Sequence, residues 1–249
     1  MILAIIDHLH DDKPSLKACS LVCRAWSHPA RVHLLSELTV SPSDHANWPL
    51  LLSATLPFAR DLRIDGPGNL STILPLLVGN NRLRSLHLIR LRVDRLNDPA
   101  SSTALLNLSG VVTLRLWSIF FPDVTSLAQL VCAFPRLQTL CLSCIAWDRI
   151  SLPPPTSFCL SPNLLALELK DTAIDTIIMW LLSLPVRPTL RSVALGSRHI
   201  RDQSVFRKFI SALENSNSLE FFSFPALFEH GTLSCPSLCP CQCCMLDQL

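Results

Sequence analysis

The residues of this chain that could bind a metal ion lie near its two ends. Five cysteines fall within ten residues near the C-terminus, at Cys235, Cys239, Cys241, Cys243 and Cys244. Thiolates at this density can bind zinc or copper. Neighbouring cysteines here are separated by three, one, one and no residues, unlike the regular knuckle pairs of structural zinc sites. We interpret residues 229–249 as a Cys- and Pro-rich disordered tail, with a thiolate metal site as the alternative.

A second group of metal-binding residue types lies near the N-terminus. His8 and His10 stand beside Asp7, Asp11 and Asp12. Residues two apart on a helix point about 200° away from each other, so the two imidazoles cannot bind one ion. We interpret this group as the charged end of a helix.

Catalytic and nucleic-acid-binding signals are missing from the rest of the sequence. The chain contains no G-x-S-x-G, no H-E-x-x-H and no glycine-rich phosphate loop, and it has six glycines in all. Its net charge is +2, and acidic residues are spread among its arginine clusters. We therefore predict a protein that is not an enzyme, has no cofactor or metal, and binds no nucleic acid.

The chain is apolar overall, with 49 % hydrophobic residues. Asp123, Asp175 and prolines interrupt its apolar runs before the ~20 residues that a membrane-spanning helix needs. Residues 1–9 have no basic flank and no cleavage site of a signal peptide. The eleven cysteines are odd in number, and several lie inside apolar-patterned elements. We expect a reduced protein of the cytoplasm and/or nucleus that does not contact a membrane.

The elements that position any binding residues follow a repeated apolar pattern, L-x-x-L-x-L. Its middle position recurs every 24 to 29 residues along the chain. The middle positions are Leu38, Leu62, Leu86, Leu114, Leu140, Leu167, Val193 and Phe222. This period is typical of leucine-rich repeats, which span ~20–29 residues each.

The repeated pattern predicts short parallel strands joined by helices. Side chains alternate along a strand, so the last two apolar residues of each repeat face one side and the residue between them faces the other. Segments 126–132, 174–184 and 206–213 carry apolar residues at helical spacing and connect consecutive strands. We predict an α/β leucine-rich-repeat solenoid of about eight repeats over residues 35–228, with a parallel sheet shaped as a horseshoe.

The same alternation predicts which side chains line the open, concave face of the sheet. The central column reads Thr39, Arg63, His87, Arg115, Cys141, Glu168, Ala194 and Ser223. Arg63, His87 and Arg115 are on successive strands, and Trp117 flanks Arg115. Aromatic residues beside arginines are enriched at protein interfaces. We predict that a partner with an acidic or phosphorylated segment binds Arg63, His87, Arg115 and Trp117. The alternative is that these residues form a solvated surface that binds no partner.

Residues 1–34 carry helical rather than strand periodicity. Ile2, Ile5, Ile6 and Leu9 form one apolar stripe on a first helix. A second helix is predicted over 15–27, with two apolar faces, and a third over 30–35 after a break where His28 precedes Pro29. One face of the second helix can pack on its neighbours, which leaves the other for a second protein.

The run Leu16-Lys17-Ala18-Cys19-Ser20-Leu21-Val22-Cys23-Arg24-Ala25-Trp26, after Ile5-Ile6-Asp7-His8-Leu9, resembles the F-box. The chain up to about residue 228 resembles fungal F-box proteins with leucine-rich repeats. This resemblance implies a substrate receptor of a Skp-cullin-F-box ubiquitin ligase, whose F-box docks on the Skp-type adaptor while the repeats bind a protein substrate. The adaptor-binding residues would be Ile2, Ile5, Ile6, Leu9, Leu21, Val22 and Trp26.

The resemblance is incomplete at the first helix of the F-box-like segment, residues 1–34. F-boxes usually open with Leu-Pro-x-Glu-Ile/Leu, and this chain starts after the position of that pair. We expect either a start codon further upstream or the loss of part of the docking surface. The alternative function is a stand-alone leucine-rich-repeat scaffold that binds a partner without the adaptor.

Overall fold

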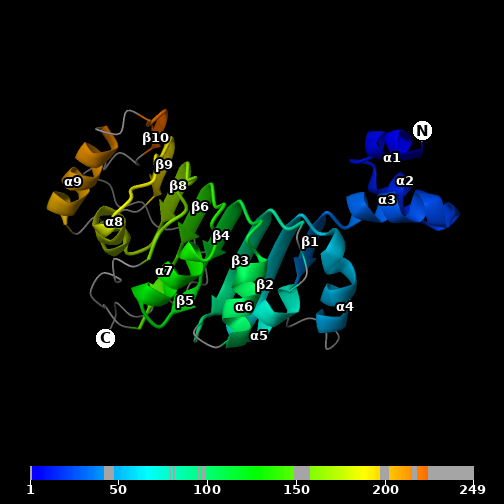
Figure 1. Ribbon diagram of the computed structural model, residues 1–249, viewed down its shortest axis with the longest axis horizontal. Coiled ribbons are helices and arrows are strands. Elements are labelled where there is room, and N and C mark those ends of the chain that lie inside the picture. Colours follow the sequence, from blue (N-terminus) through cyan, green and yellow to red (C-terminus); the bar gives the residue numbers. More distant parts are fainter. Residues whose placement is uncertain are drawn as a thin grey trace, which may run out of the picture.

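The computed structural model describes residues 2–41, 48–78, 80, 82–94, 96, 99–148, 158–196, 202–214 and 218–223. The expected tail at 229–249, and the last apolar position of the final repeat, Phe224, lie outside these residues. A long parallel sheet with helices along one side makes up most of the molecule, and three helices form a separate group at its N-terminal end (Figure 1).

The sheet is built from strands that pair in parallel with the next strand along the chain. Its order is β1 (Glu37–Val40), β2 (Asp61–Asn69), β3 (Ser85–Arg92), β4 (Thr113–Trp117), β6 (Thr139–Ser143), β8 (Ala166–Lys170), β9 (Ser192–Gly196) and β10 (Phe221–Ser223). Two short strands, β5 (Phe120–Phe121) and β7 (Ala146–Trp147), continue the pairing beside β3. The register places side by side the eight middle positions that the spacing identified, from Leu38 on β1 to Phe222 on β10.

Helical segments connect most of the consecutive strands and cover one face of the sheet (Figure 1). They are α4 (Trp48–Thr55), η1 (Leu56–Phe58), α5 (Leu70–Ile73), η2 (Leu74–Leu77), α6 (Pro99–Asn107), α7 (Val124–Cys132), α8 (Ile174–Ser183) and α9 (Gln203–Glu214). The three connecting helices expected from periodicity are confirmed as α7, α8 and α9, each a few residues longer or shorter at its ends. The buried apolar side chains of the strands, mostly leucines, and those of the sheet-facing sides of these helices form one continuous core.

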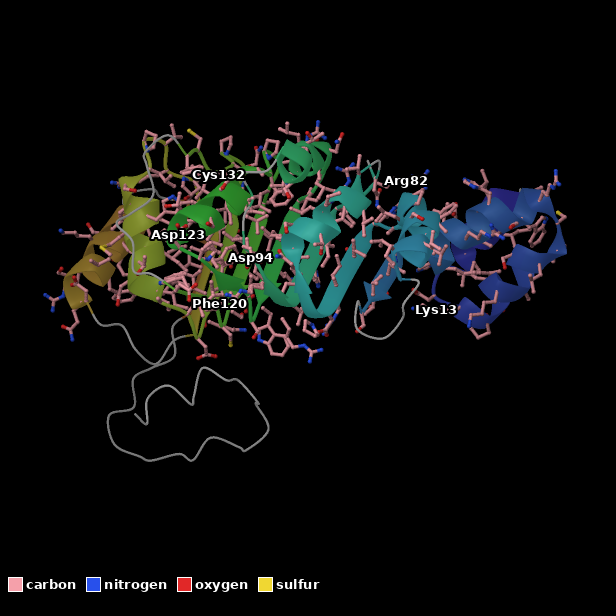
Figure 2. All side chains as sticks on the ribbon, turned by 90° about the horizontal axis from the view of Figure 1, so that it is seen from below. Lys13, Arg82, Asp94, Phe120, Asp123 and Cys132 are labelled. Carbon is pink, nitrogen blue, oxygen red and sulfur yellow. The ribbon has the colours of Figure 1, made fainter. Side chains whose placement is uncertain are left out.

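The connecting helix α7 begins at a side-chain cap. The Asp123 carboxylate accepts a hydrogen bond from the Ser126 backbone N–H at 2.7 Å and one from the Ser126 hydroxyl at 2.9 Å. This satisfies one of the N–H groups that the first helical turn leaves unpaired. Asp123 and Cys132 mark the two ends of this helix in Figure 2.

The N-terminal group consists of α1 (Ile2–His8), α2 (Lys13–Val22) and α3 (Arg24–Leu34). Its own small core contains Ile6, Leu16 and Ala30 and is separate from the core of the sheet. Around it pack the partly buried side chains of Ile2, Leu9, Cys19, Trp26 and Leu34. An ion pair of 3.9 Å between Lys13 and Glu37, and an edge-to-face contact between His28 and Phe58 with 5.7 Å between ring centroids, connect this group to the first strands and turns.

Two predictions about these helices are wrong. The helix expected over 15–27 is two helices, because Cys23 has an extended backbone with φ −162° and ψ 170°. The break expected at Pro29 does not occur, since Pro29 lies inside α3. A proline removes one helical hydrogen bond, and here the complete burial of Ala30 and the packing of Trp26 and Leu34 on the same helix compensate.

No helix in the described part of the chain has both the length and the apolar character needed to cross a bilayer.

Candidate functional site

The open face of the sheet presents a column of side chains that none of the described helices covers. The register places Arg63 of β2 beside His87 of β3, and His87 beside Arg115 of β4. Cys141 of β6 and Glu168 of β8 follow in the same column. Adjacent strands of a sheet lie about 4.8 Å apart, so the alternation brings the three predicted basic positions to one small area.

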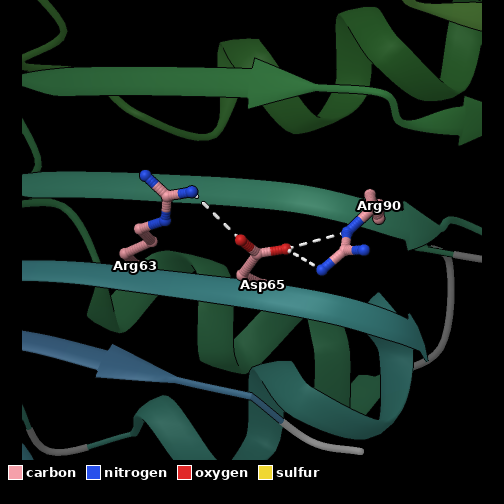
Figure 3. Close-up of polar contacts among 3 residues, drawn as sticks. All are labelled: Arg63, Asp65 and Arg90. Atoms are coloured by element: carbon pink, nitrogen blue, oxygen red, sulfur yellow. Dashed lines mark hydrogen bonds and ion pairs between the residues drawn. The ribbon is translucent and has the colours of Figure 1, made fainter. Parts of the chain in front are cut away.

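Arg63 is already held by a carboxylate on its own strand. Its guanidinium donates to Asp65 Oδ2 at 3.0 Å, and Arg90 donates from Nε and Nη2 to Asp65 Oδ1 at 2.9 Å and 2.7 Å (Figure 3). Partial burial disfavours the ionised carboxyl, but the hydrogen bonds and charges of the two arginines outweigh it and lower the pKa of Asp65. Arg90 reaches this carboxylate from a left-handed backbone conformation, φ 56°.

A second set of paired charges lies on β8. The Lys170 ammonium forms an ion pair with the Glu168 carboxylate, which also accepts a hydrogen bond from the Cys141 thiol. These hydrogen bonds lower the pKa of Glu168. Burial, with the adjacent carboxylate, raises the pKa of Cys141 to about 11, so its sulfur is a neutral thiol at physiological pH. The thiol therefore contributes a hydrogen-bond donor to the site and no nucleophile.

Arg115 is an exposed cation without a hydrogen bond or ion pair within the described ranges. The nearest carboxylates in the register are on β2 and β8, each two strands away, or about 10 Å. His87, beside it, is half-buried; burial and the charges of Arg115 and Arg63 lower its pKa, against the opposing charge of Asp61. The column thus offers a positive charge without a direct ion pair, next to an imidazole whose lowered pKa favours its neutral form.

An apolar area adjoins Arg115. Trp117 is 41 % exposed, and the register pairs it with Ile89, which is 6 % exposed although it faces the open side. Together with the charged groups these side chains line an open depression of about 370 Å³. The lining residues are Arg63, His87, Ile89, Arg115, Leu116, Trp117, Cys141, Ser143, Glu168 and Lys170.

Six of the ten residues that line the depression were not predicted as binding residues. Ile89, Ser143 and Lys170 occupy the same column as Trp117, two positions after the central one, so strand alternation extended by one column identifies them. Cys141 and Glu168 belong to the predicted central column, and Leu116 belongs to the buried face of β4. Arg90, which holds Asp65, follows no strand alternation because its backbone leaves the extended region.

The N-terminal residues predicted to bind an adaptor differ in exposure. Ile6 is fully buried, and Ile2, Leu9 and Trp26 are partly buried against the small core. Ile5, Leu21 and Val22 are 42 %, 85 % and 67 % exposed. The large apolar side chains that α1 and α2 present to solvent are therefore Leu3, Ile5, Leu21 and Val22.

Among the described residues, no three His, Cys, Asp or Glu side chains are grouped so that they could hold a metal ion.

Comparison of the sequence with known protein families gives no match, and comparison with curated proteins gives none.

Proposed function

We propose that this chain is the substrate receptor of a Skp-cullin-F-box type ubiquitin ligase, in which residues 1–34 bind the adaptor and a leucine-rich-repeat domain of about eight repeats binds a protein substrate. Its place of action would be the cytoplasm and/or nucleus. The proposal combines the F-box-like run in α2 and α3 with the exposed apolar residues of the same segment.

The observation that carries the proposal is the exposure of Leu21 and Val22 at the end of α2. Each is more than half exposed, while Leu16 of the same helix is fully buried in the small core. Leaving such side chains in water forgoes roughly 1.5–3 kcal/mol each that burial would supply. A helix with one face buried internally and apolar residues on another is suited to a second protein.

A stand-alone repeat scaffold is the competing function. It would use the depression around Arg115 and leave the helical group without a partner. The charged and aromatic open face favours partner binding under both functions, so only adaptor binding separates them.

Co-purification of the full chain with a Skp-type adaptor tests the proposal. We expect wild type to retain the adaptor and Val22→Asp to lose it, because a buried carboxylate without a partner is strongly unfavourable. Val186→Asp is the matched control, since Val186 is 65 % exposed in the repeat region and lies on no helix of the N-terminal group. Circular dichroism verifies that both variants keep their helical content.

Trp26→Ala is expected to act differently from Val22→Asp. Trp26 packs on the small core, so its truncation should destabilise the helical group as well as weaken adaptor binding. Equal adaptor retention by wild type, Val22→Asp and Val186→Asp would contradict the proposal, as would a wild-type chain that retains no adaptor.

A further inference from the structure

The cations around the depression are not equivalent. Arg63 and Arg90 share the Asp65 carboxylate, and Lys170 is paired with Glu168. Each of these cations already compensates a carboxylate of the chain, so part of its charge is neutralised before a ligand binds. Within the described ranges Arg115 makes no hydrogen bond or ion pair, and its charge acts on the Glu168 carboxylate only at a distance, so its five N–H donors can all reach an anionic group.

The same strand places an apolar contact at a fixed distance from this cation. Arg115 and Trp117 are two residues apart on β4 and face the same side of the sheet. Strands rise about 3.3 Å per residue, so their backbones are separated by about 6.6 Å. Ile89 of β3 lies beside Trp117 in the register and enlarges the apolar surface next to Trp117.

An extended peptide has the same repeat. Its side chains at i and i+2 are on one face and are about 6.6 to 7 Å apart. A peptide laid along β4 can therefore place an anionic side chain on Arg115 and an apolar side chain on Trp117 at the same time. A helix would place residues i and i+2 on different faces and could not do so.

We propose that the depression centred on β4, which extends from β2 to β8, binds an extended protein segment that carries an anionic side chain and an apolar side chain two residues apart. The inference rests on the proposed function, because it names the class of substrate that the repeat domain would take. The anionic group is a carboxylate or a phosphoryl group, both of which match the planar guanidinium of Arg115. Ser143 and the Lys170–Glu168 pair line the depression on the side of β6 and β8.

Fluorescence polarisation with the purified full chain tests this substrate class. The probes are fluorescein-labelled nine-residue peptides in an Ala/Ser background with Glu-x-Leu, Leu-x-Glu, phosphoserine-x-Leu and Leu-x-phosphoserine. Comparison peptides replace the anionic residue by Gln, replace Leu by Ser, or separate the two residues by four. We expect the matched peptides of at least one order to bind about tenfold or more tightly than all three comparisons.

Variants of the chain assign the two contacts. Arg115→Gln should weaken the matched peptides about tenfold and leave the weak binding of the Gln peptide unchanged. Trp117→Ala should remove the preference for Leu over Ser, and Trp117→Phe should retain most of it. Arg136→Gln is the control, because Arg136 is exposed and does not line the depression.

Several results would overturn the proposal: equal binding of the matched and the widely spaced peptides, affinities unaffected by Arg115→Gln, or a single-stranded oligonucleotide that binds through Arg115 as tightly as the best peptide. Preference for the phosphoserine or for the glutamate peptides identifies the source of the anion, and both results support the proposal. The assay contains no adaptor. If the chain retains the adaptor but binds no peptide, this inference alone is refuted. If the chain binds the peptide but retains no adaptor, the receptor function is refuted.

Discussion

Asn80 is a buried polar residue whose side chain satisfies four backbone groups. Its Nδ2 donates to the carbonyls of Leu56 and Ala59 at 2.7 Å and 3.1 Å, and its Oδ1 accepts from the N–H groups of Arg82 and Leu83 at 2.8 Å and 3.2 Å. It thus fixes the segment after η1 to the turn that precedes β3. Ser161 has a similar role before β8, where its hydroxyl donates to the Pro135 carbonyl at 2.9 Å.

Asn80→Ala is expected to destabilise the fold substantially. The substitution leaves buried backbone donors and acceptors unpaired, and each such group costs about 1–3 kcal/mol. We expect a loss of about 2–4 kcal/mol in the free energy of unfolding, measured by urea denaturation. Asn107→Ala is the matched control, since Asn107 is exposed and its side chain donates to the Thr103 carbonyl at 2.9 Å, within its own helix. Equal unfolding midpoints for the two variants would show that Asn80 has no such role.

His87 gives the open face a dependence on pH. Burial and the neighbouring arginines lower its pKa from 6.5 in the folded chain. As the pH falls below 6.5, the unfolded chain takes up a proton at this residue before the folded chain does, so the folded state loses stability. At higher pH both states are neutral at His87 and this loss is absent.

We therefore expect stability to fall between about pH 7.5 and about pH 5.5, and to fall less in His87→Gln. Urea denaturation at the two pH values measures the difference. A direct check is the NMR titration of the His87 ring, assigned with His87→Gln, which should have its midpoint below 6.5 and shift upward in Arg115→Gln. A midpoint at or above 6.5 in wild type would contradict the assigned environment.

Among the connecting elements, α7 depends on its N-terminal cap. Loss of a capping carboxylate typically costs about 1 kcal/mol. We expect Asp123→Ala to lower the free energy of unfolding by about that amount, and Asp123→Asn or Asp123→Ser to restore most of it. Asp148→Ala, at an exposed residue after β7, should change stability little. The idea fails if Asp123→Ala and Asp148→Ala unfold at the same denaturant concentration.

The sheet could be predicted because its register follows from two simple periods. Apolar residues two apart identify the buried face of each strand, and their recurrence every 24 to 29 residues identifies the neighbouring strands. The observed pairing of Arg63 with His87, and of His87 with Arg115, follows directly from that register. The register does not predict which of these side chains are already paired with a carboxylate. The contact between Arg90 and Asp65, for example, depends on the left-handed backbone conformation of Arg90.

The N-terminal helices were predicted less well because helical periodicity does not detect a short break. Leu16, Cys19 and Trp26 keep a helical spacing across Cys23, although the backbone there is extended. The proline rule failed for a different reason. It describes the local preference of the residue before Pro29, and burial of Ala30 and Trp26 against α1 and α2 overrides that preference.

At the scale of the whole molecule, two cores divide the chain into a small helical group and a long sheet. The exposed apolar residues Leu21 and Val22 belong to the first, and Arg115 and Trp117 belong to the second. In Figure 1 the helical group lies beyond β1, at one end of the sheet. Under the proposed function, this arrangement would place the adaptor and the substrate on separate parts of the molecule.

The most direct test of the proposed receptor function is a bridging assay with immobilised Skp-type adaptor, the full chain, and the fluorescent peptide that binds best. We predict that the beads capture the peptide only when the chain is present. Val22→Asp should abolish capture of both chain and peptide, whereas Arg115→Gln should lower capture of the peptide about tenfold at peptide concentrations below the wild-type Kd and should retain the chain. Peptide capture that does not require the chain, or that survives both substitutions, would contradict the proposal that this protein links an adaptor to a substrate.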